Sequence, residues 1–179
     1  GLLRSGLLKR FESSPYAFAR TCEKMADSHD VFLGLLATGK VATGAALREW
    51  AATDSDDPDE VEEYLAARLE ELDDAADYDV DLLRAHAEHD RNLLRSFATE
   101  ADKVTRAQDP TLSALVEDLA AIAAEAEAEG IGESEIRDKR KVLIFSYFAD
   151  TVEWIEEHLQ DVVSKDPRLA AYQGRIASL

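Results

Sequence analysis

The chain is poor in cysteine, with Cys22 as the single example among 179 residues. One cysteine excludes an internal disulfide and any zinc site built on several thiolates. Cys22 lies in a helical pattern between Phe18 and Met25, so we expect a small buried residue and not a nucleophile. The opening LLRSGLLKRF is too short and too quickly charged for a signal peptide or a membrane span. We therefore expect a cytoplasmic protein.

Catalytic motifs are also lacking. The sequence contains no GxxxxGK[ST] phosphate loop, no GxGxxG and no GxSxG. His86 and His89 are three residues apart in HAEHD, but this is not the HExxH pattern and no third ligand stands out. Paired acids such as Asp56 and Asp57 are too numerous to nominate a general acid/base pair. The sequence predicts no catalytic residue, no metal site and no cofactor in this chain.

Basic residues are scarce, and the formal net charge is -18. The excess acid is concentrated in residues 51–81, which hold 14 acidic residues against Arg68 alone, whereas residues 1–50 carry a net charge of +2 and residues 137–179 of zero. Because phosphates require basic partners, any nucleic-acid contact must use the two ends. The acidic segment is interpreted as a solvated helix face or as an adaptation to a salty cytoplasm. The alternative is a docking surface for a basic partner.

Caps and apolar periodicity predict helices through most of the chain. Ser14 as N-cap and Pro15 at the first helical position start a helix that runs to about Ala37, and Gly39 stops it. A shorter helix precedes it. Further helices are expected near residues 43–51 and 61–74.

The second half of the chain shows the same pattern. Asp79 or Asp81 is expected to cap a helix that reaches about Gln108, and Asp109-Pro110 to start the next. The apolar stripe of the first of these is Leu83, His86, Leu94, Phe97, Ala101 and Val104. Gly130 and Gly132 end the second, and residues 130–140 are expected to form a mobile, solvated connection.

Residues 141–148, KVLIFSYF, form a short β-branched and aromatic run. Such runs are typical of buried parallel strands, and an amphipathic helix follows at once. The residues after it suffice for one crossover unit but not for a parallel sheet. The predicted fold class is therefore mainly α, an array of about six helices with a small βα element at the C-terminus.

Several segments resemble the Snf2-like branch of superfamily 2 helicases and ATP-dependent DNA translocases. LLKRFESSPYAF, residues 7–18, resembles the segment that follows the first motor lobe. DPTLSALVEDL, residues 109–119, and KVLIFSYFADTVEWIEEHL, residues 141–159, resemble the helix leading into the second lobe and then its first strand and helix. YQGR, residues 172–175, lies where such proteins begin their second strand.

The resemblance implies a division of the chain. Residues 1–138 would be a helical inter-lobe region with the acidic insertion 51–81, and residues 139–179 the truncated start of a second RecA-like lobe. Residues 19–108 would then be a helical insertion between the lobes. The parent would bind ATP and Mg and translocate on DNA. This chain lacks a phosphate cradle and a metal-binding acid, so we expect it to be inactive as an ATP hydrolase.

The resemblance also implies contacts with nucleic acid at two places. Residues at the end of the predicted strand would meet a DNA phosphate through their amides and the serine hydroxyl, and a basic pair with a serine near a helix start would form a second contact. These candidates are Ser146, Tyr147 and Phe148 for the first, and Lys9, Arg10 and Ser13 for the second. The alternatives are that Phe148 packs under Trp154 and Ile155, and that Arg10 only pairs with Glu12, with Glu23 or with an acid of the insertion.

Two functions follow from this sequence. The first is a fragment of a helicase that positions the motor lobes. The second is a self-contained acidic helical module that binds a basic partner, with the strand added to a partner sheet. In either case the unpaired apolar strand is a template for association.

Overall fold

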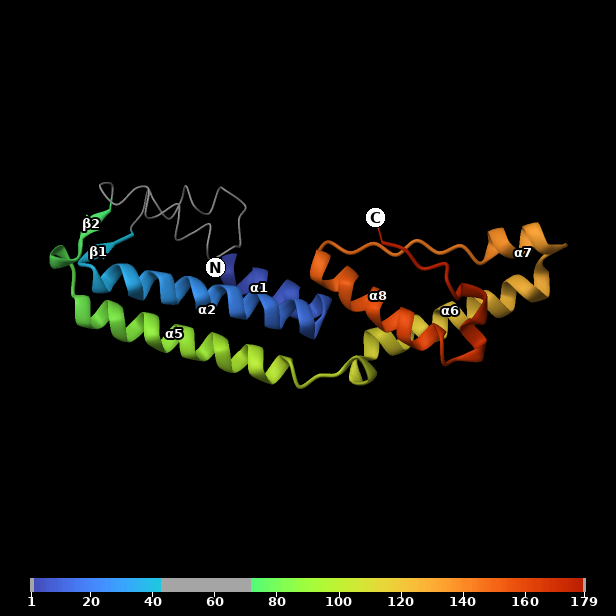
Figure 1. The fold of residues 1–179 in the computed structure, drawn as a ribbon, viewed down its shortest axis with the longest axis horizontal. Coiled ribbons are helices and arrows are strands. Elements are labelled where there is room, and N and C mark those ends of the chain that lie inside the picture. Colours follow the sequence, from blue (N-terminus) through green and yellow to red (C-terminus); the bar gives the residue numbers. More distant parts are fainter. Residues whose placement is uncertain (1, 43–71, 179) are drawn as a thin grey trace. The chain divides into compact units, whose positions relative to one another are not determined.

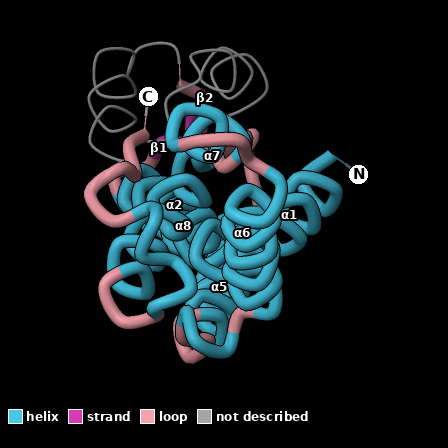
Figure 2. Tube along the Cα trace, turned by 90° about the vertical axis from the view of Figure 1, so that its right-hand side faces the viewer, coloured by secondary structure: helices cyan, strands magenta, loops and turns pink. Residues whose placement is uncertain are grey.

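The computed structural model describes residues 2–42 and 72–178 (Figure 1). The chain divides into two compact units. The first unit contains residues 1–18 and 101–179, and the second contains residues 19–100. Helices dominate both units (Figure 2), which confirms the predicted mainly α fold class.

The second unit is built on helices α2 (Pro15–Ala37) and α5 (Val80–Ala101), and the first turn of α2 belongs to the first unit. Arg91 on α5 donates to Asp30 on α2 at 2.9 Å, which ties the two helices together. Small side chains dominate their buried surfaces: Ala19, Cys22, Ala26, Ala87, Leu94 and Ala98.

A short sheet closes one end of this helix pair. Strands β1 (Lys40–Val41) and β2 (Asp73–Asp74) pair antiparallel, with Lys40 opposite Asp74. Beneath them lies a small apolar cluster that consists of Leu36, Val41 and Ala75, with Phe32, Val80 and Leu83 packed against it. Within the described ranges this is the one strand pairing.

The predicted start and end of α2 are confirmed. The Ser14 hydroxyl accepts a hydrogen bond from the amide of Ala17 at 3.0 Å, as an N-cap does. At the other end, Gly39 has a φ of 83°, a left-handed conformation in which a side chain would be strained. Both signals are local, and both act where the sequence places them.

Helix α5 begins as predicted but ends earlier than predicted. Asp79 accepts from the amide of Leu82 at 3.0 Å and so caps the start. The helix stops at Ala101 and not at Gln108. The reason is a separate turn, the 3₁₀ helix η3 (Arg106–Gln108), in which the Gln108 side chain accepts from the amide of Thr105 at 3.1 Å.

The buried face of α5 also differs from the predicted stripe. His86 and Phe97 are exposed, whereas Ala87 and Ala98 are buried. The prediction weighed large side chains above the alanines at positions 87 and 98. The predicted face was therefore wrong at these positions, although Leu94 and Ala101 are buried as expected.

The first unit is formed by α1 (Leu2–Ser13), α6 (Pro110–Glu129), α7 (Glu133–Lys139), α8 (Ala149–Val163) and the 3₁₀ helix η4 (Pro167–Tyr172). Its main core lies among α6, α8 and η4. The buried members are Val116, Leu119, Ala120, Leu159, Val163 and Leu169. An exposed, bidentate ion pair between Arg168 of η4 and Glu117 of α6, with distances of 2.8 and 2.9 Å, also links η4 to α6.

Helix α6 starts and ends where the sequence predicts. Asp109 accepts from the amide of Thr111 at 2.9 Å, Pro110 occupies the first helical position, and Gly130 is the C-cap. A carboxylate at this position satisfies amides that lack a partner within the helix.

Residues 133–139, predicted to belong to a mobile connection, form helix α7. Lys139 pairs with Glu129 at 3.0 Å and Arg140 with Glu127 at 3.3 Å, so α7 is tied back to the end of α6. Ile136 occupies the space that a side chain at Gly130 would need. The prediction was wrong because these contacts join residues ten or more positions apart.

The strand predicted at residues 141–148 is not paired with any described residue. Figure 1 shows this segment stretched out between α7 and α8, and no ladder includes it. A strand requires a neighbouring edge that supplies backbone partners, and no segment within residues 2–42 and 72–178 pairs with it. The βα element predicted at the C-terminus is therefore an unpaired extended segment followed by α8.

Some predictions fall outside the described residues. These are the helix near residues 43–51, most of the helix near residues 61–74 and most of the acidic segment 51–81. At the end of the second helix the prediction was wrong, because Asp73 and Asp74 form strand β2, which pairs with β1. The predicted domain boundary between residues 138 and 139 lies within the first unit and stays a prediction. Within the described ranges, every helix is too short or too polar to cross a bilayer.

Candidate nucleic-acid interface

The candidate residues gather where the end of α1 meets the start of α8, within the first unit. The hydroxyl oxygens of Ser13 and Thr151 are 2.8 Å apart, and those of Ser14 and Thr151 are 3.2 Å apart. Ser14 and Thr151 are buried. Two segments separated by almost 140 residues are thus joined by a small hydroxyl cluster, because each buried hydroxyl needs a hydrogen-bond partner.

Arg10 links the same two segments through charge. Its Nη1 donates to Asp150 Oδ2 at 3.0 Å, and both side chains are about one quarter exposed. The guanidinium also lies over the ring of Phe148, 4.1 Å from the ring centre. A partly buried arginine that pairs with a carboxylate and stacks on a ring is held in one orientation. Arg10 is therefore a positioning residue whose charge is already balanced.

Trp154 supports this junction from below. Tyr16 stacks on Trp154 with ring centres 5.2 Å apart and planes 9° apart. The indole Nε1 donates to Asp109 at 3.0 Å, and Arg106 lies 4.5 Å from the ring centre. Asp109 also caps α6, so one carboxylate connects α6 to α8. The start of α8 is held by α1, α2 and α6 together.

The other candidates surround this junction. The Ser146 hydroxyl accepts from the amide of Phe148 at 3.2 Å, an arrangement that turns the chain into α8. Phe148 is half-buried beneath Arg10, and it is Tyr16 that stacks on Trp154. Tyr147 contacts the edge of Phe148 and is otherwise exposed.

Lys9 is the one candidate cation with a free charge. Its side chain is exposed and has no ion pair within the described part of the chain. A phosphate that approaches the start of α8 meets the Ser146 hydroxyl and the first amides of α8, which lack a side-chain cap. It also meets Asp150, whose charge Arg10 offsets. The arrangement can hold a backbone phosphate, but it presents no pair of side chains placed to read bases.

Three residues of this site were missed by sequence reasoning: Tyr16, Asp150 and Thr151. Asp150 and Thr151 are in the first turn of a predicted amphipathic helix, where such residue types are ordinary caps. No local signal pairs them with α1. Only the folded chain brings them to Arg10 and Ser13.

Comparison with protein-family models, with curated proteins and with solved structures found no match to this chain.

Reactive chemistry is not evident at this site. The prediction that Cys22 is buried is confirmed: its side chain is fully buried, and burial raises the pKa of the thiol to about 11. Groups of three or more potential metal ligands are absent from residues 2–42 and 72–178. The junction is a positioned surface, and Lys9 on the neighbouring turn of α1 has no ion pair with any described acid.

Proposed function

We propose that this chain is a fragment of a Snf2-like helicase or translocase, comprising the helical region between the two motor lobes and the start of the second lobe. In this proposal it positions the lobes in a cytoplasmic parent and touches the DNA backbone. In this proposal ATP and Mg bind to other parts of the parent, because the residues of this chain include no phosphate loop. It is not catalytic by itself.

One observation carries this proposal. The segments that resemble the family, residues 7–18, 109–119 and 141–159, all lie in the first unit and meet around the start of α8. The intervening residues 19–100 form a unit of their own. An insertion between two parts of a motor requires that the segments flanking it meet. It also requires that the inserted residues form a unit of their own.

DNA binding tests the backbone contact. Fluorescence anisotropy with a labelled duplex is expected to show weak binding that weakens as salt rises, with a log–log slope of about 0.9 per phosphate contacted. Lys9→Glu should lower the affinity and reduce the slope by about one contact. Lys165→Glu is the matched control, because it makes the same charge change at the other end of α8, where Lys165 pairs with Asp161.

Two outcomes would overturn the proposal. One is ATP turnover by the isolated chain, and the other is equal loss of DNA binding in the two lysine variants. The alternative, an acidic module for a basic partner, is favoured by the exposed aspartates around β2, which include Asp73, Asp74 and Asp77. A labelled oligolysine in the same assay distinguishes the two, since an acidic module binds it more tightly than DNA.

A further inference from the structure

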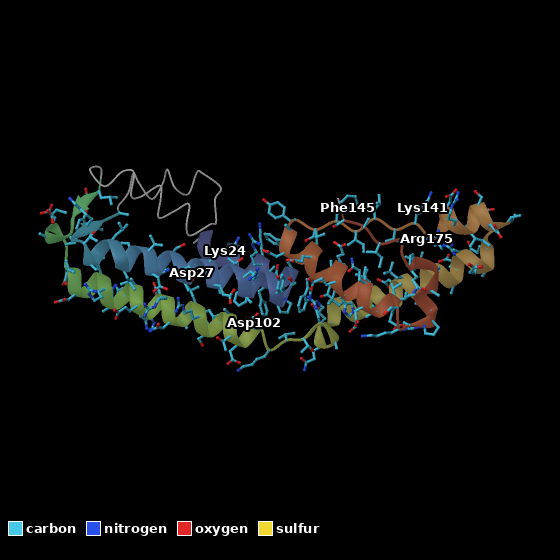
Figure 3. The ribbon with its side chains drawn as sticks, viewed as in Figure 1. Lys24, Asp27, Asp102, Lys141, Phe145 and Arg175 are labelled. Atoms are coloured by element: carbon cyan, nitrogen blue, oxygen red, sulfur yellow. The ribbon has the colours of Figure 1, made fainter. Side chains whose placement is uncertain are left out.

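The segment between α7 and α8 is extended and exposed. Leu143, Phe145 and Tyr147 are 78, 88 and 93% exposed, whereas Val142 and Ile144 are 37 and 42% exposed. Alternation with a period of two is the mark of an extended backbone. Figure 3 labels Phe145 within this segment. Three large apolar side chains of one short segment are therefore open to solvent.

The backbone of residues 142–147 is also open. Within the described part of the chain, no amide or carbonyl of these residues has a backbone hydrogen bond. Endoproteases bind a substrate as an extended strand through its backbone groups, and they seat one side chain in a specificity pocket. A segment whose backbone is already paired must open before it can be bound in this way. Residues 142–147 meet both requirements without any opening.

We propose that residues 142–147 are a site of limited proteolysis, cut in the folded chain by serine endoproteases whose specificity pocket is a hydrophobic slot. The first bond cut among the described residues is the one between Phe145 and Ser146. The protease serine adds to the carbonyl carbon of Phe145, the bond to the nitrogen of Ser146 breaks, and this nitrogen leaves with a proton as a new amine. Water then releases Phe145 as a carboxylate, so the net change is the addition of one water molecule.

Phe145 is the preferred residue because its bond has unpaired backbone on both sides. A protease engages residues before and after the bond that it cuts. Tyr147 lies at a bend that leads directly into the first turn of α8. Leu143 lies close behind Lys141, whose amide still donates to the carbonyl of Asp138 at 3.3 Å. Phe145 lies between these two held ends.

Other exposed aromatic residues of the described chain lie in helices. Phe11 and Phe97 are 58 and 42% exposed, but they belong to α1 and α5. A helical backbone does not fit a site that binds an extended strand, so a protease reaches these residues only when the helix opens. Exposure of the side chain is therefore not sufficient, and the extended backbone distinguishes Phe145.

The cut chain should keep its fold, because the segment is a connection and not a part of the core. The piece that follows the cut carries α8 and η4, whose Leu159, Val163 and Leu169 lie in the core beside α6. A polar contact joins the same two pieces, since Trp154 donates to Asp109 at 3.0 Å. These contacts do not require a continuous chain at the cut. We expect the two pieces to remain one folded unit.

Brief digestion of the folded full chain with chymotrypsin tests the site, and mass spectrometry assigns each bond that is cut. Phe145→Asp should slow the cut after residue 145 roughly tenfold or more, because a charged side chain does not fit a hydrophobic slot. Ile131→Asp is the matched control, because Ile131 is 87% exposed in the same unit and lies outside the segment. This control should be cut after Phe145 at the unchanged rate.

Sucrose distinguishes a cut of the native chain from a cut that follows opening. It stabilises the folded state, so cuts after Phe11 or Phe97 should slow as the open form becomes rarer. The cut after Phe145 should keep its rate. A short peptide substrate in the same solutions corrects for any change in the protease itself.

Size-exclusion chromatography of the cut protein, with the protease inhibited, tests whether the pieces stay together. They should elute as one species in buffer and as two in concentrated urea. Pieces that separate in buffer overturn the inference that the segment is only a connection.

The site itself is overturned if no cut follows Phe145, or if sucrose slows that cut as much as the cuts in helices. Equal effects of Phe145→Asp and Ile131→Asp also overturn it. The proposal does not depend on nucleic acid, and Lys9→Glu, which tests the DNA contact, should leave the cleavage rate unchanged. Failure of one proposal is thus distinguishable from failure of the other.

Discussion

Asp109 is expected to be the most sensitive polar residue of the first unit, because one carboxylate performs two tasks. One oxygen caps α6 by accepting from the amide of Thr111 at 2.9 Å, and the other accepts from the indole of Trp154 at 3.0 Å. Asp109 is buried, at 3% exposure. Water therefore cannot replace it when it is removed.

The expected loss follows from these two bonds. Removal of an N-cap costs about 0.5–2 kcal/mol, and leaving a buried donor without a partner costs about 1–3 kcal/mol. Asp109→Ala should thus lower the free energy of unfolding by roughly 2–5 kcal/mol. This is a large part of the total stability of a small domain, which is about 5–15 kcal/mol.

Two comparisons isolate the indole bond. Asp79→Ala removes an N-cap that is exposed and whose one side-chain hydrogen bond to a described residue is to the amide of Leu82, so it should cost about 1 kcal/mol. In a Trp154→Phe background the indole N–H that donates to Asp109 is absent. Asp109→Ala should then lower the free energy of unfolding only by the contribution of the N-cap. The difference between the two backgrounds is the coupling energy.

Urea unfolding followed by far-ultraviolet circular dichroism measures all four proteins of this cycle. If Asp109→Ala costs no more than Asp79→Ala, or costs the same in both backgrounds, the indole bond contributes nothing. The reasoning that Asp109 joins α6 to α8 is then refuted.

Two further predictions concern titratable groups. Burial and the nearby Arg106 charge lower the pKa of His158, so the unfolded chain binds this proton more readily than the folded one, and stability should fall as the pH drops below about 6.5. His158→Gln should flatten that part of a urea-midpoint profile against pH, and an unchanged slope would contradict the assignment. Cys22, with its thiol pKa raised to about 11, should react with a thiol reagent at neutral pH only as fast as the second unit opens. Labelling as fast as a free thiol would show that the site is accessible.

Helix starts were predictable because their chemistry is local. Ser14-Pro15 and Asp109-Pro110 each combine a side-chain acceptor with a residue that lacks an amide hydrogen, and both caps form as predicted. The end of α5 was not predictable in the same way. There, a Gln108 side chain that bonds to Thr105 competes with continued helix, and the periodicity of apolar residues does not report that competition.

The candidate site was predictable in part. Sequence reasoning nominated Lys9, Arg10 and Ser13 on one side and Ser146, Tyr147 and Phe148 on the other, and the folded chain brings Arg10 into contact with Phe148. The partners that hold these residues, Asp150 and Thr151, were missed. They carry no signal beyond ordinary first-turn residues.

The sequence by itself determined the mainly helical class and the capped starts of α2 and α6. Each depends on neighbours within a few positions, where backbone geometry and side-chain type are sufficient. The tertiary structure alone decided which segments meet: Arg10 with Asp150, Tyr16 with Trp154, and α7 with the end of α6. It also decided that Leu143, Phe145 and Tyr147 stay exposed, because a strand is buried only where the fold supplies a neighbour.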